Sequence, residues 1–590
     1  MVRKPCGAWG LARYSHHADR ISCPSPGGLA TFPTTPIESP ILQDALSRGN
    51  DAIAGHEWEA AATCFRQALS EQPSAEAWEG LAISTSYLDQ DSATVDARER
   101  AIRLYRESGN AAGAARCAIW LANDIMEFRG DWAVADGWLQ RAASLLSTVA
   151  GPTPEAAMLL GFRAHMALQG DGDPVAARAL AVQSRTVSRA CGAVDVEMMA
   201  LAIEGLSLVN EGRVQEGMRM LDEATIAAVS GEMSDPNLIG TSCCYLIHAC
   251  ERIRDYPRAI QWSAHVRKLA EQWQLGSFFV VCRTQYASIL MCRGEFTAAE
   301  KELEAALRHA ELHRPALTRG ATVRLGELRR RQGRFGEAEE LFAQMGTHRM
   351  AALGRGLIAL QRNEHQNALE CFEGLLRRTP TENLTERVAI LEGMIRALAA
   401  VSRIDDAERF VRQLEEIAAT VDTDPLRAAA CAARANVLAA ASRHAEARDA
   451  FTDAIVGYEA SGESHELARN RLALARSLAL LGRRAEALQQ ARVSATSLEA
   501  MGADADAREA HTLIRSISGG RKDLKSSPQL TIRELDVLRL IAAGHGDKAI
   551  ANRLDLSEHT IHRHVSNILR KLGVSSRAAA ASWAARRQLV

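Results

Sequence analysis

The chain has 590 residues, of which 47% are hydrophobic and 24% are charged, with 70 Lys and Arg against 72 Asp and Glu. This much apolar surface can build a core, which excludes a wholly disordered chain, and the net charge of −2 gives the chain as a whole no basic signature for nucleic acid. Aromatic residues make up only 5% and alanine dominates the apolar set, which favours closely packed helices over a β-sandwich.

The charge is unevenly distributed along the chain. Residues 521–590 hold thirteen Lys and Arg but six Asp and Glu, a net charge of +7, which leaves −9 on the rest of the chain. A mildly acidic body with a basic tail indicates a nucleic-acid-binding module at the C-terminal end.

The sequence lacks the signatures of membrane insertion, secretion and the common enzyme classes. No run of 18 or more residues is both apolar and uncharged, so no membrane span is expected. No apolar signal segment follows the opening MVRKPCGAWG, so we expect a cytoplasmic protein. The chain has no phosphate-binding loop, no glycine fingerprint for dinucleotides, and neither an HExxH nor a GxSxG motif. These absences disfavour an enzyme, and no cofactor is indicated.

The twelve cysteines are scattered and form no CxxC pair, which is typical of reduced, buried thiols. The densest cluster is Cys243, Cys244, His248 and Cys250. Cys243 and Cys250 are seven residues apart and share one helical face, so they could also ligate a metal. Core cysteines on an alanine-rich helix are far commoner, and no metal site is predicted.

In chain order, residues 1–40 come first and contain six of the sixteen prolines, with serine, threonine and glycine between them. This composition predicts a disordered leader.

Residues 41–515 repeat a pattern of small and bulky residues with a period near 40. In one unit the turn residue Gly130 precedes Ala135, Leu139 and Ala142, and the same spacing of four and then three recurs along the chain. The small anchor residues of the units are Ala61, Ala97, Ala135, Ala177, Gly217, Ala259, Ala299, Ala338, Ala368, Ala407, Ala447 and Ala487.

This spacing predicts about twelve pairs of antiparallel helices. It places the anchor and the bulky residue on one face of the second helix of each pair. A glycine, asparagine or serine before that helix supplies the tight turn, where positive φ is often needed. The small anchor lets the first helix approach, and the bulky residue fills the gap to the next unit. Stacked units bury a face that no single pair could bury alone.

The pattern resembles the tetratricopeptide repeat, although these units run near 40 residues and that family's unit has about 34. The resemblance implies an all-α solenoid with a concave groove that can hold a peptide, a protein or a small ligand. Trp58, Trp132 and Phe296 are interpreted as solenoid core rather than as a ligand cage.

The repeat stops before residue 516. Residues 516–528 read SISGGRKDLKSSP, and this mixture of glycine, serine, proline and charge predicts a flexible linker.

Residues 529–590 predict a small domain of four helices. Thr531 is expected to cap the first helix, with Glu534 completing a capping box. Asp547 is expected to cap the second helix and Ser557 the third, after a short turn at residues 555–556. A buried stripe on the third helix comprises Ile561, Val565, Ile568 and Leu572.

The outward face of the third helix is rich in hydrogen-bond donors. It comprises His559, His562, Arg563, Ser566, Asn567 and Arg570. A short turn followed by a polar, basic helix is the helix-turn-helix plan, and such a face suits base edges and phosphates. The alternative is a solvated face of an ordinary helical bundle.

The segment resembles the LuxR-type (GerE-like) DNA-binding domain over about 61 residues. The matching residues are Leu530, Thr531, Arg533, Glu534, Val537, Leu538, Gly544, Lys548, Ile550, Ala551, Leu554, Ser557, Thr560, Ile561, His564, Ile568, Leu569, Lys571, Leu572, Gly573, Val574 and Arg577.

The resemblance implies specific contacts with double-stranded DNA. It assigns base edges in the major groove to His562, Arg563 and Ser566. It assigns phosphates to Thr531, Lys548, Ser557, Lys571 and Arg577. The family usually has Lys or Arg where His562 stands, so Arg563 is expected to carry more of the base readout. The resemblance also implies a homodimer on two half-sites and RNA polymerase as a partner.

The sequence therefore predicts a bacterial transcription regulator whose repeat region binds an unknown effector or protein partner. The competing hypothesis is a protein-interaction scaffold in which the C-terminal domain is a minor DNA anchor.

Overall fold

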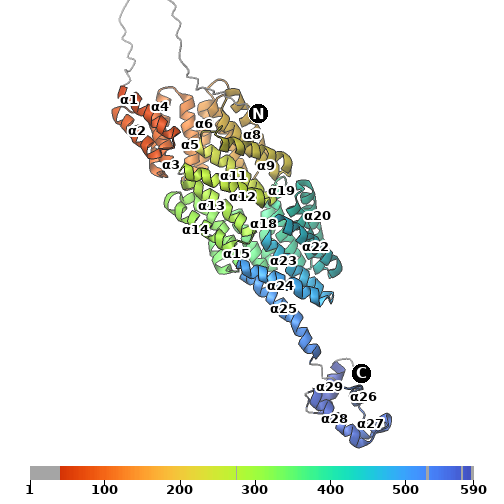
Figure 1. Cartoon of the computed structure of the whole chain (residues 1–590). Coiled ribbons are helices and arrows are strands. Elements are labelled where there is room, and N and C mark those ends of the chain that lie inside the picture. The colour runs from red at the N-terminus through yellow and green to blue at the C-terminus, as the bar shows by residue number, and fades with distance from the viewer. Residues whose placement is uncertain (1–39, 274–275, 526–529, 573, 575, 587–590) are drawn as a thin grey trace, which may run out of the picture.

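The computed structural model describes residues 40–273, 276–525, 530–572, 574 and 576–586, and every regular element in these ranges is helical. Figure 1 shows a long array of paired helices over residues 40–525 and a separate group of four helices after it. The leader predicted for residues 1–40 lies outside the described residues, apart from Pro40 at the start of the first helix.

The array comprises twelve helix pairs and one further helix within the described residues. The first six pairs are α1 (Pro40–Ala54) with α2 (Trp58–Glu71), α3 (Ala75–Tyr87) with α4 (Asp91–Glu107), α5 (Ala111–Arg129) with α6 (Trp132–Leu146), α7 (Pro154–Met166) with α8 (Pro174–Cys191), α9 (Val194–Asn210) with α10 (Val214–Ser230) and α11 (Pro236–Ile253) with α12 (Tyr256–Gln272). The next six are α13 (Gly276–Cys292) with α14 (Phe296–His313), α15 (Thr318–Gln332) with α16 (Phe335–Gln344), α17 (Arg349–Gln361) with α18 (His365–Arg378), α19 (Leu384–Ala400) with α20 (Ile404–Val421), α21 (Asp424–Ala440) with α22 (His444–Ser461) and α23 (Ser464–Leu480) with α24 (Arg484–Met501). Helix α25 (Asp504–Lys525) follows, a π-turn η1 (Ala167–Asp171) extends α7, and a 3-10 turn η2 (Pro315–Leu317) precedes α15.

The predicted repeat is confirmed unit by unit. Each of the twelve anchor residues lies on the second helix of its pair, and each is buried. The anchor Gly217 shows why the position must be small, because a Cβ built on its partner Gly205 of α9 would lie 2.8 Å from the Gly217 carbonyl oxygen. Small anchors therefore set the close approach of the two helices in a pair.

The bulky residue of the pattern wedges between successive units, as predicted. Phe372 of α18 is fully buried between glycines of the two neighbouring first helices. A Cβ on Gly356 of α17 would lie 2.7 Å from the Phe372 ring, and one on Gly393 of α19 would lie 2.6 Å from it. The ring thus occupies the space that two missing side chains leave open.

Each turn within a pair contains one residue with positive φ. Glycine, asparagine and serine fill most of these positions, but Asp89 and Arg254 also adopt φ of 56° and 61°. In the first unit the left-handed residue is His56 rather than Gly55, the residue that the pattern indicates. The turn geometry is therefore constant, although its sequence signal is not.

The interpretation of one aromatic residue as core is wrong. Trp58 and Phe296 are buried, but Trp132 is 40% exposed. Trp132 is the first residue of α6 and lies over the η1 turn, where a Cβ on Gly170 would be 3.5 Å from its ring. At Trp132 the first position of the second helix faces this turn, whereas the same position is buried at Trp58 and Phe296.

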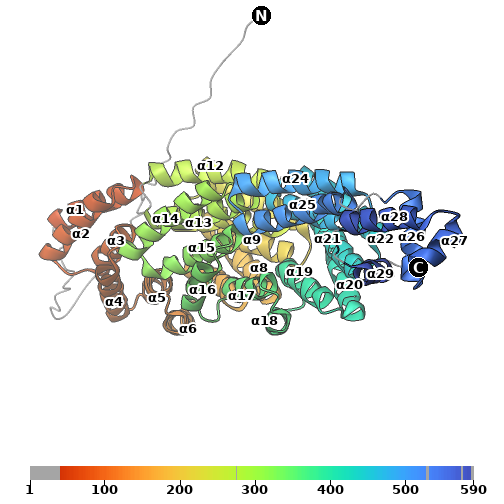
Figure 2. The same ribbon diagram turned by 90° about the horizontal axis from the view of Figure 1, so that it is seen from below.

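The array winds into a superhelix whose coils touch (Figure 2). Trp58 Nε1 of the first unit donates to the carbonyl oxygen of Trp273, which follows the sixth unit, at 3.4 Å. Asn383, just before α19, donates through Nδ2 to the Gly172 carbonyl oxygen at 3.0 Å. The side chain of Arg254 in the sixth unit is within ion-pair distance of Glu463, just before α23. Turns of one coil therefore rest on loops five or six units further along.

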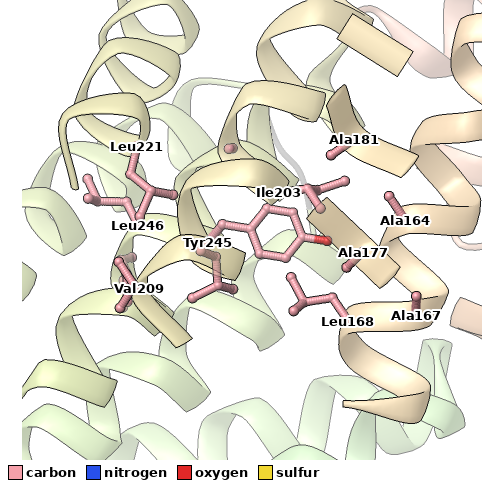
Figure 3. Packing of buried hydrophobic residues seen from close by; sticks show 14 of the residues in the cluster. Ala164, Ala167, Leu168, Ala177, Ala181, Ile203, Val209, Leu221, Tyr245 and Leu246 are labelled. Carbon is pink, nitrogen blue, oxygen red and sulfur yellow. The ribbon is translucent and has the colours of Figure 1, made fainter. Parts of the chain in front are cut away.

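Buried side chains connect neighbouring pairs into shared clusters, of which one runs from Ala75 to Val437. Figure 3 shows Tyr245 of α11 among side chains of η1, α8 and α9, including Leu168, Ala177 and Ile203. Tyr245 is 2% exposed, and its hydroxyl lies 2.5 Å from His165 Nδ1. The buried phenol therefore has a hydrogen-bond partner, as a polar atom in a core requires.

The segment predicted as a linker is partly helical. Helix α25 continues through residue 516 to Lys525, and residues 526–529 of the segment lie outside the described residues. Paired glycines weaken a helix but do not forbid one, and α25 already runs without a break from Asp504.

The C-terminal group has its own core. It consists of α26 (Ile532–Ala542), α27 (Asp547–Leu554), α28 (Glu558–Leu572) and α29 (Arg577–Arg586). Its buried residues are Val537, Leu538, Ile541, Ile550, Ala551, Ile561, Val565, Ile568, Ala580 and Ala584, all from these four helices. The all-α class, the solenoid and the four-helix domain that the sequence predicts are thus confirmed.

Candidate nucleic-acid interface and repeat cavity

A tight turn joins α27 to α28. Asp555 ends α27 with a left-handed φ of 54°, and the Leu556 amide donates to the Ala551 carbonyl oxygen at 3.0 Å. The Ser557 hydroxyl oxygen then accepts from the Thr560 amide at 3.1 Å, as predicted for a cap. This turn fixes the direction of α28 relative to α27.

A capping box fixes the start of α26. Thr531 Oγ1 accepts from the Glu534 amide at 3.2 Å, and Glu534 Oε2 accepts from the Thr531 amide at 2.7 Å. The same carboxylate oxygen accepts from Lys571 Nζ at 2.6 Å. Burial acts to raise the pKa of Glu534, but these hydrogen bonds hold it below its usual value. The start of α26 is therefore tied to the end of α28.

One face of α28 is buried and the opposite face is exposed. Ile561, Val565 and Ile568 are at most 8% exposed, and Leu572 packs at the edge of the same core. The exposed residues are His559, His562, Arg563, Ser566 and Arg570, while Asn567 is half-buried and accepts from Arg570 Nη2 at 3.1 Å. The predicted stripe and its polar opposite face are therefore both present.

The three residues predicted at base edges lie together on this exposed face. Arg563 and Ser566 make no hydrogen bond or ion pair with any described residue. His562 is 77% exposed, and its Nδ1 lies 3.7 Å from Asp547 Oδ2. The guanidinium of Arg563 and the hydroxyl of Ser566 are accordingly free to contact an external acceptor.

Most residues predicted at phosphates already bond within the domain. Thr531 and Lys571 contact Glu534, and Ser557 contacts Thr560. Arg577 donates to the Asp547 carboxylate and, at 2.5 Å, to the His545 carbonyl oxygen. Lys548 is exposed and makes no such contact with the described residues. The structure thus gives four of these five residues a stabilising role. The caps at Thr531 and Ser557 were predicted, but the bonds of Lys571 to Glu534 and of Arg577 to Asp547 were not.

Asp547 does not cap α27 as predicted. The cap residue is Gly546, and α27 begins at Asp547 itself. The Asp547 carboxylate instead binds Arg577, thirty residues further along the chain. The sequence pattern assigned the Asp547 carboxylate to the backbone amides at the start of α27. In the structure it binds the Arg577 side chain instead.

The solenoid contains a cavity of 1340 Å³. The wall is built largely from first helices of the pairs, including α11, α13, α15, α17, α19 and α23. Charged side chains such as Arg324, Glu392 and Arg469 line it together with apolar residues such as Leu357. Sequence reasoning predicted a groove but not its residues, because the first helices carry no regular pattern.

The cysteine cluster belongs to the core. Cys243 and Cys250 of α11 are fully buried, and burial raises the pKa of both thiols, so they stay protonated at neutral pH. Within the described ranges, no group of His, Cys, Asp and Glu side chains is arranged to hold a metal ion. None of the helices in the same ranges combines the length and apolar character that crossing a membrane requires.

Comparison with known families matches both parts of the chain. Residues 528–584 match "Bacterial regulatory proteins, luxR family", and residues 46–84 and 287–345 match "Tetratricopeptide repeat". The spore germination protein GerE of Bacillus subtilis is 42% identical over 59 residues, which are 10% of this chain and 80% of that protein. The nitrate/nitrite response regulator NarL of Escherichia coli K12 is 51% identical over 55 residues, which are 9% of this chain and 26% of that protein. The chain thus spans about a quarter of the length of NarL.

Two solved structures align with more than half of this chain. A Rap protein complexed with competence and sporulation factor aligns over 67% of this chain and 99% of its own, with 12% identity and a TM-score of 0.37. A Cut9–Hcn1 complex aligns over 80% of this chain and 96% of its own, with 11% identity and a TM-score of 0.34.

Proposed function

We infer that this chain, which belongs to the luxR family of bacterial regulatory proteins, regulates transcription by binding double-stranded DNA sequence-specifically through α28. The observation that carries the proposal is the exposed face of α28, on which Arg563 and Ser566 have no partner among the described residues. His562, Arg563 and Ser566 stand there in the C-terminal region of net charge +7, on a helix whose other face is held by its own core. A donor-rich helix of this kind fits the major groove.

Arg563 is the principal reader of base identity in this proposal. Its guanidinium has no partner among the described residues, and an arginine fork binds the two acceptors on the edge of guanine. Lys548 approaches the phosphate backbone, because its ammonium is exposed and without a partner in the same ranges. Thr531, Ser557, Lys571 and Arg577 set the orientation of α28 through their bonds within the domain and approach phosphates from there.

The biological assembly in this proposal is a homodimer on two half-sites that acts on RNA polymerase, as is usual for DNA-binding modules of this plan. The solenoid binds an effector or partner protein at its cavity. Binding of the effector or partner protein to the solenoid then controls whether the protein binds DNA.

The test is selection of genomic DNA fragments by the full-length protein and by Arg563→Ala. Arg539→Ala is the matched control, because Arg539 is an exposed arginine of the same domain on α26 rather than α28. The wild type and the control should enrich one two-fold-related motif. Arg563→Ala should lose discrimination at one base pair by about 1–3 kcal/mol.

Identical motif strength in Arg563→Ala would overturn the assignment of Arg563. Failure of the wild type and of an isolated 521–590 fragment to enrich any motif would favour the scaffold hypothesis. Binding that weakens steeply with salt would show phosphate contacts, whereas salt-insensitive partner binding without an operator would also favour the scaffold.

A further inference from the structure

The wall of the solenoid cavity carries a nearly balanced set of charges. Nine arginines and eight carboxylates line it. Every one of the eight carboxylates forms an ion pair with an arginine of the same wall. Arg469, for example, pairs with Glu466 and lies 3.8 Å from Asp506, and Arg330 pairs with Glu327. One arginine of the wall is left without a carboxylate partner.

The remaining arginine is Arg396 of α19. It lines the cavity and makes no hydrogen bond or ion pair with any described residue. The positive charge of Arg469 and then burial lower the pKa of Arg396 to about 10, so it stays protonated at neutral pH. The neighbouring Glu466 and Asp506 are already held by Arg469. Arg396 is therefore a cation beside another cation, without an anion of its own.

A second unpartnered donor lies in the same wall. Arg324 is 6% exposed and binds Glu251 and Gln285 through Nη2, at 2.8 and 3.0 Å. Its Nε is buried and has no partner among the described residues. Buried charged donors normally find acceptors, and a protein that keeps them unpaired sacrifices stability.

We propose that the solenoid cavity binds a small organic anion, whose carboxylate or phosphate group is held by Arg396. The proposal deepens the proposed function, because it gives the effector a chemical class. The anionic group supplies the acceptor that the wall lacks, and arginine suits both carboxylate and phosphate because its donors form a planar fork. Leu353, Leu357 and Leu360 in the same wall provide contact for an apolar body. The cavity of 1340 Å³ is larger than the anionic group alone requires.

The test is thermal unfolding of the full-length protein during titration with inorganic phosphate or with hexanoate, at constant ionic strength. Arg396→Met removes the guanidinium and its charge and keeps an unbranched side chain about as long as the arginine stem. Arg377→Met is the matched control, because the Arg377 side chain on α18 is 72% exposed and lies outside the cavity. Phosphate stabilises proteins non-specifically as well, so the difference between the variants carries the result.

The wild type and Arg377→Met should show a saturable rise of Tm with one of the two anions. Arg396→Met should lose apparent affinity roughly tenfold or more, as expected for a charge-assisted hydrogen bond. In the absence of anion, Arg396→Met should melt at or above the wild-type temperature, because it removes an unpaired charge. A response to phosphate assigns a phosphorylated ligand, and a response to hexanoate assigns a carboxylate.

Three results would overturn the proposal: equal titrations of the wild type and Arg396→Met, no saturable response to either anion, or an anion-free Tm of Arg396→Met well below that of the wild type. The last result would give Arg396 a structural role. An Arg396-dependent response in a protein that enriches no DNA motif would refute the proposed function and leave the anion site standing. A DNA motif without the anion response would refute the site alone.

Discussion

Arg314 connects two coils of the superhelix, and its loss should loosen them. It follows α14 and is 2% exposed. Its Nε donates to Asp89 at 2.6 Å, its Nη1 binds Glu127, and its Nη2 donates to the Ser86 carbonyl oxygen at 2.6 Å. The guanidinium also lies 4.2 Å from the centre of the Phe128 ring. One side chain from the seventh unit therefore holds residues of the second and third.

Arg314→Met should destabilise the protein by about 3–5 kcal/mol, because it leaves the buried Asp89 carboxylate and Glu127 without their cation. The lost carbonyl contact and the lost ring contact act in the same direction. Urea unfolding followed by circular dichroism should show a lower midpoint, and hydrogen exchange should rise first in α3 and α5. Arg377→Met, with its exposed ion pair to Glu373, should change stability by less than about 0.5 kcal/mol.

The double variant Arg314→Met/Asp89→Asn separates a charge effect from a shape effect. It should recover part of the loss, because one of the two stranded carboxylates is neutralised. A midpoint for Arg314→Met indistinguishable from that of the wild type, or unchanged exchange in α3 and α5, would refute the view that this contact joins the coils.

Two further predictions concern buried carboxylates. Burial raises the pKa of Glu463 to about 7. Between the ordinary value of 4.5 and this value, the folded state holds a proton that the unfolded state has released. The free energy of unfolding therefore falls as the pH rises through this range. Glu463→Gln cannot titrate, so its stability relative to the wild type should increase between pH 5 and pH 8 by at most about 3 kcal/mol, and a constant difference in urea midpoint across that range would contradict the assignment. In the C-terminal domain, Lys571→Met leaves Glu534, itself 4% exposed, without its cation, and should cost about 1–3 kcal/mol in the melting of that domain. If Lys571 served phosphate binding alone, this variant would melt like the wild type and lose only DNA affinity, and Lys548→Met is the control that should behave in that way.

The second helices of the pairs could be predicted from sequence because their signal is local. The spacing of Ala135, Leu139 and Ala142 encodes one face of one helix, and the same spacing encodes the face in the other units. The capping box at Thr531 and Glu534 and the stripe on α28 are equally local, since successive residues of each pattern are three or four positions apart. Such patterns specify which face is buried without any knowledge of what buries it.

The remaining features depend on pairs of residues far apart in the chain. Arg314 and Asp89 are 225 residues apart, and nothing near either residue indicates the other. Lys571 and Arg577 look like free cations in the sequence, but the folded domain supplies Glu534 and Asp547 as their partners. The turn at Arg254 was missed because arginine gives no local sign of positive φ. The anchor pattern also gave no indication that Arg396 is unpaired. Arg396 is unpaired because the carboxylates near it are bound by other arginines, and those pairs form only in the folded chain.

The touching coils change the mechanics of the array. In an open repeat protein each unit contacts only its neighbours, so the molecule stretches like a spring and can fray from either end. Here the turn at Gly333 rests against Ala505, closely enough that a Cβ on the glycine would lie 2.6 Å from the alanine side chain, and Gly294 meets Met501 in the same way. Pulling the ends apart must break such contacts before it can extend the coil. The solenoid is therefore a stiff rod at low force, and its resistance should fall abruptly once the first of these contacts gives way.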